Sequence, residues 1–222
     1  MINIFFRAWL IALFLTTNVM AQQAIQVKLD PSLKGPYSGR LIVYLQSDTT
    51  KAFGRAREDW PAYSIIVREW RAGTTQTIDA SSAGYPQSID SLPVGYYRIV
   101  AMLDTNYRER SLTAPGNLYS RTEVVAKLDG GRTAAPVLTL NHVTSERKFG
   151  VTARTREVRL HSQLLSSFRK EAIYLQAGVV LPESYDRDST RYFPVVYVIP
   201  GWGGTHHHAN SQPAPVASVW CG

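Results

Sequence analysis

Alternating apolar and polar positions in short runs dominate the first two thirds of the chain. Runs rich in Val, Ile, Leu and Tyr are separated by clusters of Gly, Pro, Asp and Ser, which is typical of strands joined by turns. In one such run Tyr97, Ile99, Ala101 and Leu103 share a face by the two-residue period of a strand, so we expect them in the core. The predicted strands are residues 40–46, 63–68, 96–103, 121–128 and 136–140, with turns at residues 34–36, 72–73, 82–84, 114–117 and 129–131.

This spacing of short strands, with no helical period between them, predicts an all-β sandwich of immunoglobulin-like type over residues 22–148. The polar residues 142–150 indicate a connection to a second part, residues 149–222. There we expect strands at residues 155–161, 172–181 and 195–199. Residues 195–199 form an unbroken apolar run, which is typical of a strand covered on both faces in a parallel sheet. Within residues 172–181 the odd-numbered positions are apolar and predict the better-buried face.

Residues 1–21 have the composition of a secretory signal peptide. Their one charge, Arg7, precedes an apolar run at residues 8–15, and Val19 and Ala21 suit signal peptidase. That run is much shorter than the roughly 20 residues needed to cross a bilayer, which makes a retained membrane helix the weaker alternative. We therefore expect a secreted or periplasmic protein without a membrane span after signal cleavage.

The charge and the cysteine content argue against two classes of protein, one stabilised by disulfides and one that binds nucleic acid. The formal net charge is +7, and the single cysteine cannot form an internal disulfide, so the fold must be stabilised by burial. A nucleic-acid-binding surface would gather Lys and Arg on one face with aromatic residues between them. The densest basic set is interleaved with Glu146 and Glu157, and we expect no nucleic-acid partner; that set is Arg147, Lys148, Arg154, Arg156 and Arg159.

Residues 174–204 resemble the start of the catalytic domain of the enterochelin-esterase-like and esterase D-like α/β-hydrolases. The motifs that carry the resemblance are Val180-Leu181-Pro182, Ser184-Tyr185-Asp186, Phe193-Pro194-Val195-Val196-Tyr197 and Gly201-Trp202-Gly203-Gly204. Residues 149–222 are then the truncated start of an α/β-hydrolase domain, and the β sandwich resembles the accessory domain often fused ahead of such esterases.

The resemblance also implies a candidate site. In α/β-hydrolases the loop after this strand donates a backbone N–H to the oxyanion hole, and Trp202 is the candidate, with Gly203 next to it. His206 and His207 would line the rim of the cleft. The full-length protein would hydrolyse a small-molecule or glycan ester, without a cofactor. Family members often carry His, Asp or Ser where this chain has Pro200, which donates no N–H.

Catalysis by this route needs a Ser within G-x-S-x-G, followed by an acid and a His. No such pentapeptide occurs; residues 35–39 come nearest, but Ser38 has the wrong spacing. We therefore expect no catalytic nucleophile, acid or base here, and an N-terminal fragment that is inactive alone.

Two further interpretations concern other parts of the chain. The alternative function is a secreted β-sandwich binding module for carbohydrate or protein, with a vestigial hydrolase segment at residues 150–222. The long polar and aromatic loop at residues 104–120 is a candidate ligand-binding loop. Consecutive side chains in a loop diverge, so we expect no metal site at His206, His207 and His208.

Overall fold

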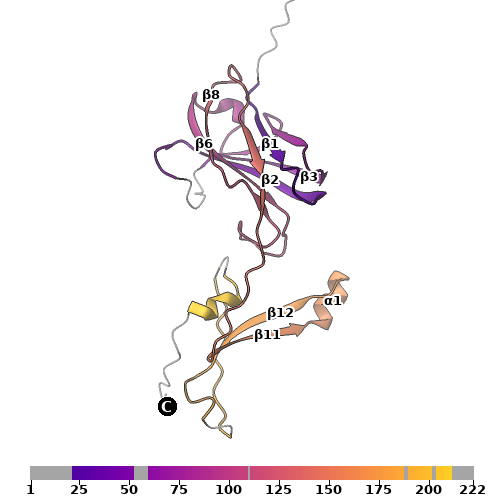
Figure 1. Cartoon of the computed structure of the whole chain (residues 1–222), viewed down its shortest axis with the longest axis vertical. Helices are drawn as coiled ribbons and strands as arrows, with labels where there is room; N and C mark the ends of the chain where they lie inside the picture. The colour runs from indigo at the N-terminus through magenta and orange to yellow at the C-terminus, as the bar shows by residue number, and fades with distance from the viewer. Residues whose placement is uncertain (1–21, 53–59, 110, 188–189, 202–203, 212–222) are drawn as a thin grey trace, which may run out of the picture.

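The computed structural model describes residues 22–52, 60–109, 111–187, 190–201 and 204–211 (Figure 1). The predicted signal peptide lies outside them. Two parts follow one another along the chain, a β sandwich and a smaller part built on one hairpin. Within the described residues, no helix is long and apolar enough to cross a bilayer.

Two sheets form the sandwich. The smaller sheet has the order β4-β1-β9, from β1 (Ile25–Leu29), β4 (Thr75–Ile78) and β9 (Val137–Leu140), and its β1–β9 pair is parallel. The larger sheet has the order β10-β7-β6-β2-β3-β5, with β8 also paired to β6, and all its pairs are antiparallel. Its strands are β2 (Tyr37–Gln46), β3 (Ala62–Trp70), β5 (Ala83–Tyr85), β6 (Gly95–Asp104), β7 (Leu118–Tyr119), β8 (Val124–Leu128) and β10 (His142–Val143), and the short helix η1 (Ile89–Ser91) precedes β6.

The core lies between the two sheets and follows the alternation of the strands. Tyr97, Ile99, Ala101 and Leu103 of β6 are all buried, as the two-residue period predicts. Alternate residues of the other central strands meet them: Ile25, Val27 and Leu29 of β1, and Leu41, Val43 and Leu45 of β2. The predicted all-β character of residues 22–148 is confirmed.

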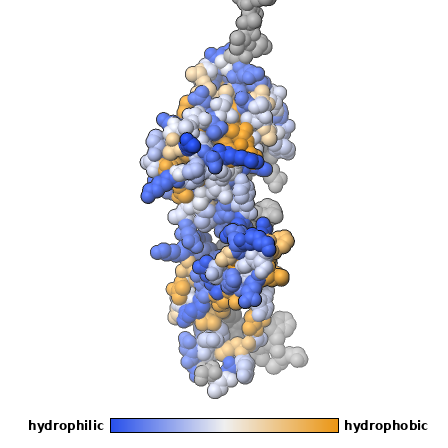
Figure 2. All heavy atoms as spheres, turned by 90° about the vertical axis from the view of Figure 1, so that its right-hand side faces the viewer, coloured by the Kyte–Doolittle hydropathy of each residue, from blue (hydrophilic) through white to orange (hydrophobic). Residues whose placement is uncertain are grey.

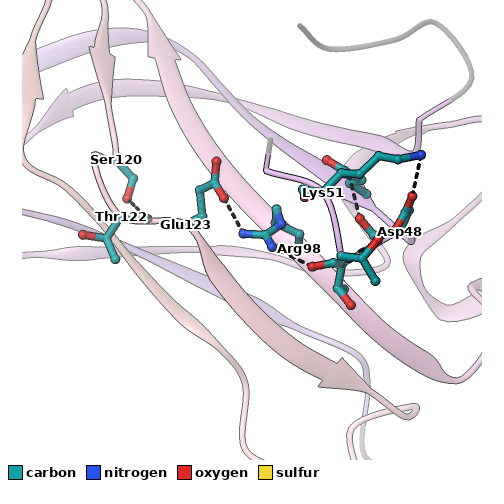
Figure 3. Close-up of polar contacts among 9 residues, drawn as sticks. Asp48, Lys51, Arg98, Ser120, Thr122 and Glu123 are labelled. Carbon is teal, nitrogen blue, oxygen red and sulfur yellow. Dashed lines mark hydrogen bonds and ion pairs between the residues drawn. The ribbon is translucent and has the colours of Figure 1, made fainter. Parts of the chain in front are cut away.

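Polar contacts fasten a loop and a neighbouring strand to the outer side of β6 (Figure 3). Arg98 Nη1 lies 2.5 Å from Glu123 Oε2, just before β8, and Arg98 Nη2 donates to the carbonyl of Thr49 at 2.6 Å. Asp48 pairs with Lys51 at 3.0 Å within the same loop. One half-buried guanidinium thus ties the β2–β3 loop and the start of β8 to one strand.

The second part contains β11 (Thr155–His161), α1 (Gln163–Arg169), β12 (Tyr174–Val180) and η2 (His206–Ser211). β11 and β12 match the predicted strands, and they form a two-stranded antiparallel sheet. α1 fills the connection between them: the Ser162 hydroxyl caps its first turn by accepting the N–H of Leu165 at 3.3 Å, and Lys170 ends it in a left-handed conformation.

Two predictions of secondary structure are wrong. Residues 195–199 form no strand, and their side chains are 70–92% exposed. A strand needs a partner for its backbone groups, and no described segment pairs with this run. The predicted turn at residues 82–84 lies earlier, where Ser82 N–H donates to Asp79 at 3.0 Å, because residues 83–85 pair with β3 as β5.

We predict that Leu103→Ala lowers the free energy of unfolding by about 2–5 kcal/mol, because it leaves a cavity between the sheets. Leu160→Ala removes the same atoms from a side chain that is 62% exposed, and should change stability by no more than about 0.5 kcal/mol. Urea denaturation followed by tryptophan fluorescence compares the two. Equal losses would contradict the position of the core.

Candidate functional site

The β11–β12 hairpin has one covered and one open face. Directly paired residues of an antiparallel ladder point to the same side, so Val158 and Leu160 share a face with Leu175. All three are about half exposed, and apolar surface is interspersed with polar surface over this part of the molecule (Figure 2). The opposite face contains Glu157 and Gly178, and η2 crosses it. The predicted burial of the odd-numbered positions of β12 is wrong, because Leu175 and Ala177 are exposed and η2 lies against Gly178 on the other face.

Gly178 allows η2 to lie against the hairpin. A Cβ at this position would overlap the carbonyl oxygen of His206 and the Cβ of Ala209, and would lie 2.9 Å from the ring of Phe149. Ala209 is the buried residue of η2. The backbone of η2 can therefore approach β12 closely only where β12 has no side chain.

His206 and His207 are held differently by the same packing. His206 Nε2 lies 3.0 Å from Glu157 Oε1, and its ring stacks on Phe149 with centroids 5.7 Å apart. The ring of His207 lies 4.2 Å from that of His206. Burial, and then the charges of His206 and Arg147, lower the pKa of His207. His207 is therefore predominantly neutral at pH 7.

A hollow of about 280 Å³ opens beside His207, between η2 and the linker that precedes the hairpin; it is lined by Arg147, Gly204, Thr205, His207, His208, Asn210 and Ser211. His207 lines this hollow, whereas His206 does not and its Nε2 lies beside Glu157. Among the described residues no group of His, Cys, Asp and Glu could hold a metal ion.

The glycine-rich loop reaches this hollow from one side. The N–H of Gly204 donates to the carbonyl of Gly201 at 2.9 Å, which brings the two ends of the loop together. A Cβ on Gly204 would overlap Pro200, so the turn depends on glycine there. The predicted oxyanion donors, Trp202 and Gly203, lie outside the described residues.

A serine and a histidine that the sequence did not single out lie within hydrogen-bond distance. Ser166 Oγ of α1 is 3.0 Å from His161 Nε2, a separation that a nucleophile and its base also show. The same hydroxyl accepts the N–H of Ile173 at 2.8 Å. Neither residue lines the hollow. These two contacts join α1 to the end of the β11–β12 hairpin.

The long loop of the sandwich, residues 104–120, is braced from within. Asn117 is fully buried, and its side-chain oxygen accepts the N–H groups of Thr105 at 2.9 Å and Asn106 at 3.0 Å. Tyr107 is 74% exposed, and Arg108 pairs with Glu171 of the second part at 2.5 Å. This loop therefore presents an exposed aromatic side chain on a fixed backbone.

Comparison with known proteins gives no relative of this chain. No protein-family model, curated protein or solved structure matches this chain. Functional assignment therefore depends on the residues and their arrangement.

We predict that Gly178→Ala displaces η2 from the hairpin, because the added Cβ meets backbone as well as side-chain atoms, at a cost of about 1–3 kcal/mol. The N–H of His208, which donates to Thr205 at 3.0 Å, should exchange faster with solvent. The matched control is Ala177→Ser on the open face, which should leave that exchange rate unchanged. Unchanged exchange in Gly178→Ala would contradict the close approach.

Proposed function

We propose that this chain is the front part of an exported serine esterase. Residues 22–148 are its accessory immunoglobulin-like sandwich, and residues 149–222 begin an α/β-hydrolase domain. The motifs of residues 174–204 support the proposal. The observation that carries it is the glycine-rich loop: Gly204 bonds back to Gly201, next to a hollow that His207 lines.

The chemistry proposed for this loop is electrostatic. When a serine hydroxyl attacks an ester carbonyl, negative charge develops on the carbonyl oxygen, and backbone N–H groups beside it stabilise that charge. Trp202, or Gly203 next to it, would donate one of these N–H groups. Pro200 cannot donate, so the donors must come from residues after it. These 222 residues contain no G-x-S-x-G pentapeptide, and we propose no hydrolysis by them alone.

The first test reads the nucleotide sequence beyond codon 222 in all three frames. We expect a G-x-S-x-G pentapeptide followed by an acid and a histidine, and the absence of such an order from every frame would contradict the proposal. In a protein extended through that pentapeptide and the acid and histidine after it, Trp202→Pro removes a backbone N–H that Trp202→Ala retains. If Trp202 is the donor, kcat on p-nitrophenyl acetate should fall about 100–1000-fold in the proline variant only.

The matching pair at the neighbouring position is Gly203→Pro and Gly203→Ala. A loss confined to Gly203→Pro would assign the donor to Gly203. Full activity in both proline variants would contradict the oxyanion role of the loop.

A binding module is the second candidate function, and the exposed Tyr107 on a loop fixed by Asn117 favours it. Aromatic side chains on a preformed surface bind with little loss of conformational entropy. If the sandwich binds a polysaccharide, Tyr107→Ala should weaken retention on that polysaccharide by about tenfold or more, and the exposed Tyr85→Ala should not. Affinity electrophoresis of the purified chain measures both variants. Retention unaffected by Tyr107→Ala would exclude this loop as the binding surface.

A further inference from the structure

We propose that the linker, the start of the hairpin and η2 form a binding site for a small anionic ligand that carries a carboxylate or phosphate group. The site is a second hollow, of about 440 Å³, that adjoins the first and shares Arg147 and Asn210 with it. Its volume is in the range of small-molecule pockets. The inference is independent of ester hydrolysis.

The charge around this hollow has one sign. Arg147, Lys148 and Arg154 line it, and no carboxylate lines either of the two hollows. Arg154 Nη1 is 3.0 Å from Glu183 Oε1, whereas Arg147 and Lys148 have no carboxylate partner among the described residues. Three cations on one concave surface repel each other, and an anion between them removes that repulsion. The fork of donors on a guanidinium also matches the oxygens of a carboxylate or phosphate.

The walls of the hollow are fixed by hydrogen bonds. Asn210 satisfies both backbone groups of Gly150 in one of the two orientations of its side-chain amide. In that orientation its nitrogen donates to the carbonyl of Gly150 at 2.8 Å and its oxygen accepts the N–H of Gly150 at 3.1 Å. Thr155 Oγ1 donates to the same carbonyl at 2.7 Å and accepts the N–H of Thr152 at 3.1 Å. The linker and η2 are thus joined at one residue, and the cationic side chains project from a braced backbone. Because these groups are already ordered, binding loses less conformational entropy.

Arg154 adds an observation that points to a ligand. The N–H of Leu181 donates to the carbonyl of Arg154 at 2.7 Å, which fixes the backbone of Arg154 at the end of the β11–β12 ladder. Arg154 Nη2 is buried and has no hydrogen-bond partner among the described residues. A buried charged donor without an acceptor is costly. An oxygen of a bound anion, reached by a rotation of this side chain, would supply the acceptor.

The arrangement favours a small anion over a polyanion. Arg147, Lys148 and Arg154 line a concave surface. They do not form part of a continuous basic surface along the hairpin, because the acidic residues Glu157 and Glu183 lie there. A nucleic acid would need several phosphates neutralised at regular intervals. One hollow with three cations suits a single charged group.

The test titrates the purified chain with inorganic phosphate and, separately, with D-glucuronate, which supplies a carboxylate on a sugar. We expect at least one of them to bind with a Kd below about 10 mM, and which one binds identifies the ligand chemistry. Arg147→Gln and Arg154→Gln should each weaken binding about tenfold or more, because each removes a charge-assisted donor. Arg40→Gln, an exposed arginine of β2 in the sandwich, is the matched control and should bind like the parent chain.

His207 gives a second, site-specific readout. Its pKa lies below the ordinary value through burial and the charges of His206 and Arg147, with Glu157 and Glu109 acting in the opposite direction. A bound anion adds negative charge next to Arg147, so the pKa of His207 followed by NMR should rise on saturation. In Arg147→Gln that rise should appear only at ligand concentrations about tenfold or more higher.

Three results would overturn the proposal. One is no binding of either phosphate or glucuronate at about 50 mM, far above the expected Kd. Another is equal weakening by Arg147→Gln and Arg40→Gln. The third is binding of heparin alone, since a surface that retains only a polyanion is not a site for a single charged group.

Discussion

Burial of alternate side chains between two sheets is the constraint on which the sandwich depends. β1 lies in one sheet and β2 and β6 lie in the other, and every second residue of these strands is removed from water. With no disulfide available, this apolar contact is the main source of stability. The polar loop at residues 104–120 and the contacts of Arg98 are added to a framework that the core already defines.

The second part is organised differently, because it has almost no core of its own. Its hairpin is covered on one face only, and the covering element is a short helix whose single buried residue is Ala209. The contact exists because Gly178 lets backbone meet backbone, and Phe149 fills the space beside it by stacking on His206. The position of the linker, of His207 and of both hollows follows from this one close approach.

The two proposals about function use neighbouring features of that part. The glycine-rich loop borders one hollow, and the cationic side chains of the linker and β11 surround the next. If both proposals hold, a charged group would bind a short distance from the place where an ester carbonyl is held. The two proposals rest on different observations. The esterase proposal rests on the resemblance and on the hydrogen bond between Gly204 and Gly201, whereas the anion-site proposal rests on the charges of Arg147 and Lys148, which have no carboxylate partner among the described residues.

Local periodicity in the sequence determined the strands and the inward face of β6, because a two-residue alternation is a property of the strand itself. It also located β11 and β12. Only the tertiary structure decided which face of β12 is covered, because the covering helix comes more than twenty residues later and packs where β12 carries a glycine. The same holds for residues 195–199, whose pattern is that of a strand but whose backbone has no described partner. The grouping of Arg147 with Arg154 around one hollow likewise arises from the fold, since charge spacing along a linker does not reveal which side chains will line the same concavity.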